Sequence, residues 1–214
     1  MKSIQFLILL FLLGGTLYAQ DDLIKLQNSS FEGKPQDATT PVGWHPCELM
    51  TTPDILPGIW GVTNDPSEGE TFVGIITRPN NTFESIGQRL TAPLLPGECY
   101  SFTVDVAHSK AYLGYNKAIK LRVWGGTEKC DKDLLIGKTG FVEEEEWETI
   151  SFDIIPQEGS PINYLIFEAF YTDKEFSRKG NILLDNVSVI KKCKRAGLDA
   201  PEQNMLTQKI EFRN

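Results

Sequence analysis

The stretch Tyr100–Ala107, which reads YSFTVDVA, decides the fold. Large apolar residues occupy every second position from Tyr100 to Val106, and small or polar residues occupy the positions between them. Successive side chains of a β-strand point to opposite faces, so a period of two is typical of a strand with one face in a core. We therefore predict a half-buried strand over these eight residues.

Short segments that are apolar or alternate between apolar and polar residues recur on both sides of this stretch. We expect further strands over residues 73–77, 83–90, 119–124, 147–155, 164–171 and 182–190. Proline and glycine separate them, at Pro93, Pro96, Gly97, Pro156, Gly159 and Pro161. Many short strands with regular turn signals indicate an all-β sandwich or barrel.

The first nineteen residues have the layout of a secretory signal peptide. Lys2 gives a positive start, residues 4–13 are apolar except for Gln5, and Ala19 supplies a small residue at the expected cut. The apolar run is shorter than the ~20 residues that a membrane-spanning helix needs. We expect a signal peptide over 1–19, one domain over 20–190 and a polar tail over 191–214. The protein is then exported, to the periplasm, the outer-membrane surface or the medium, without an integral membrane segment.

Acidic residues outnumber basic ones, at 29 against 21, for a net charge of −8. Loss of Lys2 with the signal peptide makes the charge −9. An acidic surface repels phosphate backbones and anionic lipid headgroups, which argues against nucleic acid and against docking on an anionic membrane. The balance is compatible with calcium and with neutral glycans.

Four cysteines in an exported chain predict two disulfide bonds. If residues 100–107 and 119–124 form an antiparallel hairpin, Cys99 and Cys130 fall near facing positions at its open end. Facing Cα atoms lie ~4.5–5.5 Å apart, which a disulfide can span. We favour Cys99–Cys130, which leaves Cys47 and Cys193 for the second bond, with other pairings of Cys99 still open.

Two segments near the ends of the predicted domain carry a recognisable pattern. Residues 28–32 read NSSFE and residues 184–187 read LDNV. The pair resembles the first and last strands of galactose-binding-like jelly rolls, the fold of many carbohydrate-binding modules. The resemblance implies a two-sheet antiparallel jelly-roll β-sandwich, with one structural calcium held by Glu32, Asp185 and backbone carbonyls. Such oxygens are the ligands that calcium prefers; the alternative is that Glu32 caps a turn and Asp185 binds backbone amides.

Motifs in the middle of the chain extend the resemblance. Residues 41–44 (PVGW), 97–100 (GECY) and 121–126 (LRVWGG) look like those of a jelly-roll domain in exported envelope proteins of Gram-negative bacteria. In that group the domain often precedes an OmpA-like peptidoglycan-binding domain. We expect this chain to stop after the jelly roll, so peptidoglycan binding is not carried over.

Aromatic and planar polar side chains near the predicted hairpin suggest a binding face. Carbohydrate-binding modules stack aromatic rings on sugars and fix hydroxyl groups with polar side chains. We predict a ligand-binding set of six residues: Trp124, Arg122, Tyr112, Tyr115, Asn116 and Asp105. The alternative is that Trp124 only packs against a Cys99–Cys130 disulfide.

The chain lacks the G-x-S-x-G elbow, the phosphate-binding P-loop and the H-E-x-x-H zinc motif. No carboxylate pair is singled out for glycoside hydrolysis, and the run Glu143–Glu146 is typical of a solvated loop. We predict a non-catalytic binding module of the bacterial cell envelope that binds carbohydrate. The alternative is a structural or adhesive envelope protein with a protein partner; a hydrolase with an unrecognised acid pair is a weaker third hypothesis.

Overall fold

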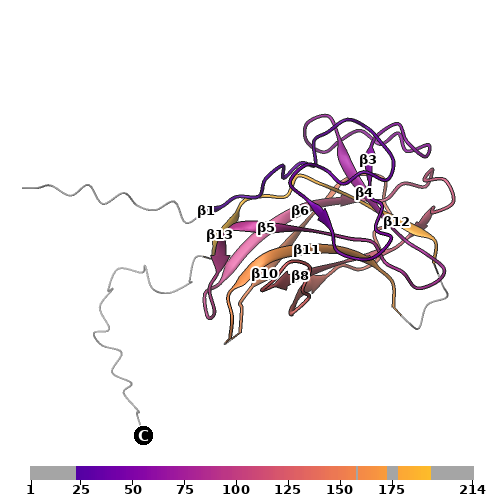
Figure 1. The fold of residues 1–214 in the computed structure, drawn as a ribbon. Helices are drawn as coiled ribbons and strands as arrows, with labels where there is room; N and C mark the ends of the chain where they lie inside the picture. The colour runs from indigo at the N-terminus through magenta and orange to yellow at the C-terminus, as the bar shows by residue number, and fades with distance from the viewer. Residues whose placement is uncertain (1–22, 158, 173–177, 194–214) are drawn as a thin grey trace, which may run out of the picture.

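The computed structural model describes residues 23–157, 159–172 and 178–193. The expected signal peptide and most of the expected polar tail lie outside these residues. Within them the chain forms two facing β-sheets and no helix (Figure 1). The described part accordingly contains no helix with the length and apolar character needed to cross a membrane.

One sheet has eight strands, and its main path runs in the order β1, β13, β6, β12, β4, β3. β10 also pairs with β6, and β7 pairs with β12. These strands are β1 (Leu23–Ile24), β3 (Asp54–Leu56), β4 (Phe72–Thr77), β6 (Tyr100–Ala107), β7 (Lys117–Ala118), β10 (Glu148–Ile154), β12 (Gly180–Asp185) and β13 (Ile190–Lys192).

The second sheet has five strands in the order β2, β5, β11, β8, β9. They are β2 (His45–Pro46), β5 (Ser85–Leu94), β8 (Lys120–Gly126), β9 (Leu134–Lys138) and β11 (Ile162–Phe170). The strands described in both sheets pair antiparallel, apart from the parallel pairing of β7 with β12. This confirms the predicted all-β, two-sheet antiparallel sandwich.

The core lies between the sheets and follows the predicted alternation. Strand β6 has the bounds expected from the sequence, and its inward residues Phe102, Val104 and Val106 are at most 1% exposed. Phe102 stacks on Phe152 of β10, with ring centroids 5.5 Å apart, and meets Phe167 of β11 across the core at 6.5 Å. Burial of these rings supplies a large share of the apolar area removed from water.

A second apolar cluster lies on the outer face of the eight-stranded sheet. Its buried members are Leu56, Val62, Phe72, Ile76, Ala107, Tyr112 and Leu183. Phe72 and Ile76 alternate along β4 with Val73 and Ile75, which belong to the main core. Strands β4 and β12 are therefore buried on both faces, because loops cover the outer side of this sheet.

The predicted disulfide pairing was wrong. Cys47 is bonded to Cys130, and Cys99 to Cys193. The prediction assumed a hairpin of β6 and β8, but these strands belong to different sheets. β6 pairs with β10, β12 and β13, whereas β8 pairs with β11 and β9. The loop between β6 and β8 crosses from one sheet to the other, so Cys99 and Cys130 do not face each other.

The Cys99–Cys193 bond continues the pairing of β6 with β13. Lys192 pairs with Tyr100, and the Cys193 amide donates to the Cys99 carbonyl at 2.9 Å. Lys191 and Lys192 were expected in the polar tail, but they lie in β13, and Lys191 also pairs with Leu23 of β1. The two ends of the described fold therefore lie side by side.

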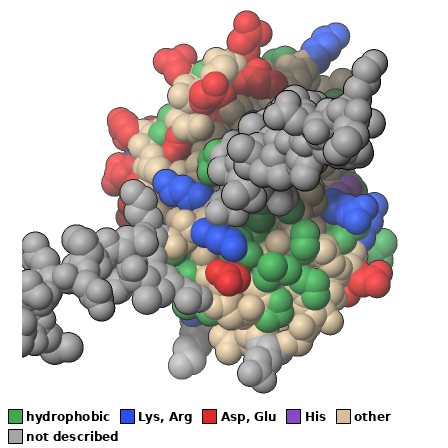
Figure 2. Space-filling view, turned by 90° about the vertical axis from the view of Figure 1, so that its left-hand side faces the viewer, with side chains coloured by type: hydrophobic (Ala, Val, Ile, Leu, Met, Phe, Trp, Pro, Cys, Tyr) green, Lys and Arg blue, Asp and Glu red, His purple; other side chains and the backbone are tan. Residues whose placement is uncertain are grey.

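The turn from β5 to β6 and the end of β10 meet at this same end of the sandwich. The Gly97 amide donates to the Pro156 carbonyl at 2.9 Å, and Leu95 and Ile155 next to them are exposed. Figure 2 faces this end and shows hydrophobic side chains gathered beside Lys and Arg side chains, with acidic side chains grouped toward its upper left.

We predict that proteolysis without reduction releases peptides joined through Cys47–Cys130 and through Cys99–Cys193, identifiable by mass spectrometry. Replacing Cys99 and Cys193 together with serine lowers the free energy of unfolding by about 2–5 kcal/mol, because the bond closes a long loop in the unfolded chain. Urea unfolding measures this loss. Recovery of a Cys99–Cys130 peptide from the folded protein would contradict the strand order described above.

Candidate functional site

The outer face of the five-stranded sheet carries a cluster of charged and aromatic side chains. Leu121 and Val123 of β8 point into the core, so the alternation turns Arg122 and Trp124 outward. On β11 the same alternation turns Glu168 outward, between the core residues Phe167 and Ala169. The register places Glu168 opposite Arg122, so these side chains meet on the surface of the sheet.

Glu168 is the centre of this cluster. Its Oε2 accepts a hydrogen bond from the Trp124 indole N–H at 2.8 Å. The Arg122 Nε lies 2.7 Å from the same oxygen, but its N–H does not point at it, so this contact is an ion pair without a hydrogen bond. Lys132 donates to Oε1 at 2.8 Å. A carboxylate only 6% exposed is stable in such a place because it has these partners.

The Arg122 guanidinium lies among aromatic rings. Its central carbon is 4.4 Å from the ring centroid of Phe170, 5.5 Å from that of Trp124 and 5.8 Å from that of Phe83. Arginine is attracted to the faces of such rings, and more strongly where water is excluded. The Trp124 ring is half-buried and fixed by contacts with Arg122 and Glu168, while part of it reaches solvent.

The Cys47–Cys130 disulfide lies on this face, over Gly87 of β5. A Cβ atom at Gly87 would come within 2.9 Å of the Cys47 sulfur, so the close approach of the disulfide requires glycine there. Ile166 of β11, also near this point, is fully buried. The disulfide thereby covers the middle of the face and joins the segment after β2 to the loop between β8 and β9.

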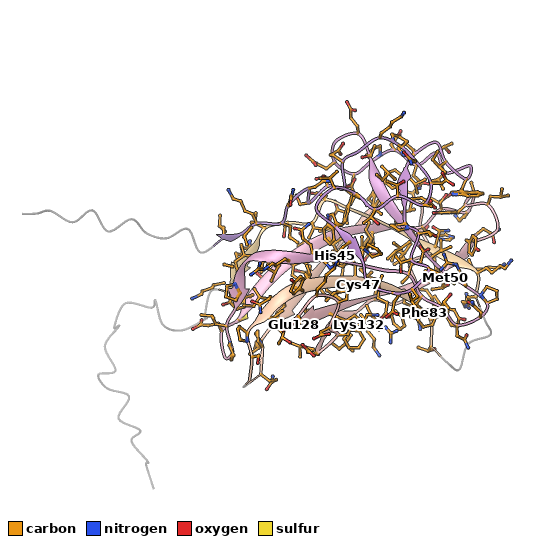
Figure 3. The ribbon with its side chains drawn as sticks, viewed as in Figure 1. His45, Cys47, Met50, Phe83, Glu128 and Lys132 are labelled. Carbon is orange, nitrogen blue, oxygen red and sulfur yellow. A yellow bond between two sulfur atoms is a disulfide. The ribbon has the colours of Figure 1, made fainter. Side chains whose placement is uncertain are left out.

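A second contact holds these two segments together, because Lys132 also donates to Glu48 at 2.6 Å. Figure 3 shows the labelled side chains of both segments, with Phe83 just before β5, across the middle of the view. Beside them is a hollow of about 300 Å³, lined by Glu48, Leu49, Asn81, Thr82, Phe83 and Glu168. Leu49 of this lining is 91% exposed, and Met50, the next residue along the chain, is 67% exposed.

His45 lies against the disulfide, and burial lowers its pKa, with the charge of Lys129 as a smaller cause. Its Nε2 is buried without a hydrogen-bond partner. In the described part of the chain, His45, Cys47 and Cys130 are the one group of three His, Cys or carboxylate residues whose ligand atoms lie within 4.8 Å of one another. Because metals bind the thiolate and both sulfurs are joined to each other, this group is not a metal site in the oxidised protein.

The structure does not bring the six predicted ligand-binding residues together. Trp124 and Arg122 lie on the five-stranded sheet. Tyr112, Tyr115 and the exposed Asn116 belong to the loop after β6, and Tyr112 and Tyr115 lie on the outer side of the other sheet. Trp124 does not pack on a Cys99–Cys130 bond; its strand neighbours are Ile166 and Leu135.

Asp105 is buried on the eight-stranded sheet and serves as an internal acceptor. It accepts hydrogen bonds from the hydroxyls of Ser67 and Thr149, each at 2.5 Å, and from the Asn186 amide at 3.0 Å. These contacts fix the segment after β12 and the loop before β4. Asp105 therefore has a structural role on the face opposite Trp124.

Glu32 and Asp185 both contact the segment 67–71. Glu32 accepts hydrogen bonds from the amides of Glu70 and Thr71, and Asp185 accepts them from the amides of Ser67 and Glu68. Gly69 has φ +71°, and a Cβ there would lie 2.0 Å from a Glu32 oxygen. Burial raises the pKa of Asp185 to about 6, and the charge of Glu32 contributes to the rise. The two carboxylates thus share one small polar region.

The sequence analysis missed Glu168, Lys132, Glu48 and Phe83 as members of the site. One signal was present, because Glu168 interrupts the apolar run of residues 165–170 at an outward position. Lys132 and Glu48 lie in loops far apart in the sequence. Only the correct disulfide pairing brings them together.

Comparison with known proteins gives relationships at the level of the fold. No protein-family model matches the sequence, and neither does any curated protein. Among solved structures, the CBM22-1 xylan-binding domain of Paenibacillus barcinonensis Xyn10C has a TM-score of 0.52 and 18% identity, covering 81% of this chain and 96% of that one. An apo-form cyclase from Fischerella sp. has a TM-score of 0.56 and 14% identity, covering 79% and 95%. The CBM22-1–GH10 part of Clostridium thermocellum Xyn10B, in complex with xylohexaose, has a TM-score of 0.50 and 16% identity, covering 82% and 29%.

These likenesses show that the fold is that of carbohydrate-binding-module jelly rolls. The same fold serves binding modules and a cyclase, so the function has to be argued from the residues of this chain.

We predict that Glu168→Gln lowers the free energy of unfolding by about 1–3 kcal/mol, because it leaves Arg122 and Lys132 half-buried without their shared carboxylate. Urea unfolding followed by tryptophan fluorescence checks the loss. Glu128→Gln, an exposed change in the neighbouring loop, is the matched control and stays within about 0.5 kcal/mol of the parent. Equal stability of the two variants would mean that the cluster has no net stabilising role.

Proposed function

We propose that this protein is a non-catalytic carbohydrate-binding module whose binding face is the outer side of the five-stranded sheet. One observation carries the proposal. The half-exposed Trp124 ring is held by Arg122 and by Glu168, and Glu168 also lines a hollow whose walls offer both hydrogen-bond donors and acceptors. A ring fixed in place loses little conformational freedom when a ligand stacks on it.

The chemistry of this face suits a neutral glycan. An aromatic ring covers the apolar face of a pyranose. Charged and amide groups of the hollow and of the lysine beside it suit hydroxyl groups: Lys132 donates, Glu48 accepts, and Asn81 does both. Because Lys132 and Glu48 already bridge two segments, these groups are held in position before a ligand arrives.

The carboxylates of this face are engaged in ion pairs, which supports a binding role over hydrolysis. Glycoside hydrolysis needs one acid that carries a proton to donate and a second that acts as base or nucleophile. Glu48 and Glu168 each form an ion pair with Lys132, at 2.6 and 2.8 Å. They are therefore suited to accept hydrogen bonds from a ligand.

A second candidate function is adhesion to a protein partner, and Leu49 and Met50 favour it. Both are strongly exposed, and Leu49 lines the same hollow. Exposed apolar side chains rimmed by polar groups are common at protein-binding surfaces. In this alternative the hollow receives a side chain of the partner.

The cellular setting remains that of an exported protein. Two disulfides among the described residues are consistent with an oxidising compartment. We propose that the protein acts at the cell envelope, in the periplasm, on the outer surface or after secretion, with glycan or an envelope protein as partner.

We also propose that one structural calcium binds between Glu32 and Asp185. Both carboxylates approach the segment 67–71, and each keeps lone pairs beyond those that the amides use. The glycine at position 69 leaves space beside the Glu32 oxygen that a side chain would fill. A calcium ion would neutralise two acids in an acidic protein and join the segment after β1 to the end of β12.

We predict that the purified, oxidised protein binds a subset of glycans on a broad array, and that Trp124→Ala lowers the signal at least tenfold. The loss of a stacked ring and its ordered surroundings is the reason. Trp60→Ala, a partly exposed tryptophan on the opposite sheet, is the matched control and leaves glycan binding unchanged. Binding that survives in Trp124→Ala would exclude this face; silence of the folded protein on the array would favour the protein-partner alternative.

We predict that millimolar calcium raises the melting temperature by about 2–5 °C at pH 7.5. Most of the effect is lost near pH 5, because the Asp185 carboxyl with a pKa of about 6 is then mainly protonated. In the presence of chelator, without calcium, stability changes with pH in the opposite direction. The pKa of Asp185 in the folded protein lies above its ordinary value of 3.8, so this group's contribution to the free energy of unfolding falls as the pH rises from 3.8 to about 6. Differential scanning fluorimetry measures both trends, and Asp185→Asn removes the calcium effect. A calcium shift of equal size at both pH values would argue against this site.

A further inference from the structure

A separate cavity opens on the outer side of the eight-stranded sheet, on the other side of the sandwich from Trp124. Its volume is about 180 Å³, below the ~300–1,000 Å³ of most drug-sized ligand pockets. It is lined by Asp37, Ala38, Thr52, Asp54, Trp60, Ile76, Arg78, Tyr112 and Tyr115. The size limits an occupant to one small group.

The walls are largely aromatic, and the backbone is arranged to bring the rings in. Tyr112 lies against β4 at Gly74, where a Cβ atom would come within 3.0 Å of the tyrosine ring. Trp60 has φ +53°, a conformation that costs energy for a residue with a side chain. The Leu113 amide donates to the Trp60 carbonyl at 2.9 Å, which ties these two loops together. Trp60 remains 44% exposed at the mouth.

The polar groups of the cavity are mainly acceptors. Asp54, 6% exposed, accepts hydrogen bonds from the Tyr112 hydroxyl, the Ala38 amide and the Trp60 side chain. Asp37 adds a second, exposed carboxylate at the rim. Tyr112 and Trp60 already direct their polar hydrogens at Asp54. A ligand in the cavity therefore meets the carboxylate lone pairs that these hydrogen bonds do not use.

The basic group of the cavity is already neutralised. Arg78 forms an ion pair with the buried Glu84, with Nη2 and Oε1 2.5 Å apart, and Thr52 also donates to this Glu84 oxygen at 3.0 Å. Arg78 and Glu84 together contribute no net charge. The two aspartates therefore give the cavity lining a negative charge next to the rings of Trp60, Tyr112 and Tyr115. Of these rings, that of Tyr115 already has a cation beside it, with the Lys179 Nζ 5.9 Å from its centroid.

We propose that this cavity binds a small organic ammonium ion, such as a methylated amine head group. Aromatic faces attract cations through their quadrupoles, and cages of aromatic rings are known to recognise quaternary ammonium groups. The carboxylates supply the opposite charge, and the rings with Ala38 and Ile76 cover the methyl groups. A sugar suits the cavity less well, because its oxygens need donors and the side-chain donors of Trp60, Tyr112 and Thr52 and the Nη2 of Arg78 are engaged.

The test compares choline with 3,3-dimethylbutan-1-ol, which has the same shape without the charge. Both are titrated into the purified, oxidised protein, and the indole N–H signals are followed by NMR; the chain has four tryptophans. We expect saturable choline binding that shifts the Trp60 signal, with the neutral alcohol at least roughly tenfold weaker. Trp60→Ala weakens choline binding by about the same factor, whereas Trp124→Ala leaves it unchanged.

Asp54→Asn tests the charge directly, and Asp37→Asn at the exposed rim tests it in a variant whose folding is not at stake. Both weaken choline binding without a matching loss for the neutral alcohol. Equal binding of choline and the alcohol, or no saturable choline binding by the folded protein, would overturn the proposal. Binding of a monosaccharide that shifts Trp60 would replace it with a second sugar site. Because Trp124 is on the opposite sheet, failure here leaves the glycan-binding proposal untouched, and the reverse also holds.

Discussion

The packing of Phe167 of β11 against Phe102 of β6 across the core is the contact on which the rest of the structure depends. Once Phe167 points inward, the two-residue period of the strand turns Glu168 outward. The antiparallel register then places Arg122 opposite it. The charged cluster on the outer face is therefore a direct consequence of how one apolar ring is buried on the inner face.

The outer faces of the two sheets stabilise their buried carboxylates in different ways. On the five-stranded sheet the Glu168 carboxylate contacts an arginine, a lysine and an indole, and a disulfide lies beside them. On the eight-stranded sheet the acids Asp54, Asp105 and Asp185 are held mainly by hydroxyls, amides and an indole. Burying a carboxylate without a cation is unfavourable, which is why burial raises the pKa of Asp54 and Asp185. The second face is thus the one with unbalanced negative charge.

The sequence predicted the strands well because their signal is local. The alternation over Tyr100–Ala107 identified β6 with its correct bounds, and the segments at 119–124 and 147–155 identified β8 and β10 within two residues. The pairing of strands is not local. Nothing in the order of β6 and β8 along the chain shows that their connection crosses between sheets, and the disulfide prediction failed for that reason.

The candidate site was predictable only in part, for the same physical reason. Trp124 and Arg122 lie two residues apart on one strand, so their common orientation follows from the pleat. Glu168, Lys132 and Glu48 come from a different strand and two loops, and strand pairing with one disulfide brings them to that place. Tyr112 and Tyr115, near Trp124 in the sequence, are carried to the other sheet by the crossing loop. Closeness in the sequence is therefore a poor guide to closeness in space where the chain crosses from one sheet to the other.

The antiparallel pairing of β1 with β13 has a practical consequence. Leu23 lies opposite Lys191, and the Cys99–Cys193 bond secures this corner, so the chain enters and leaves the sandwich at one edge (Figure 1). A domain, tether or surface attached at either terminus would be connected through that single corner. Attachment at this corner would leave the outer faces of both sheets accessible, so that each face could contact a different molecule at the same time.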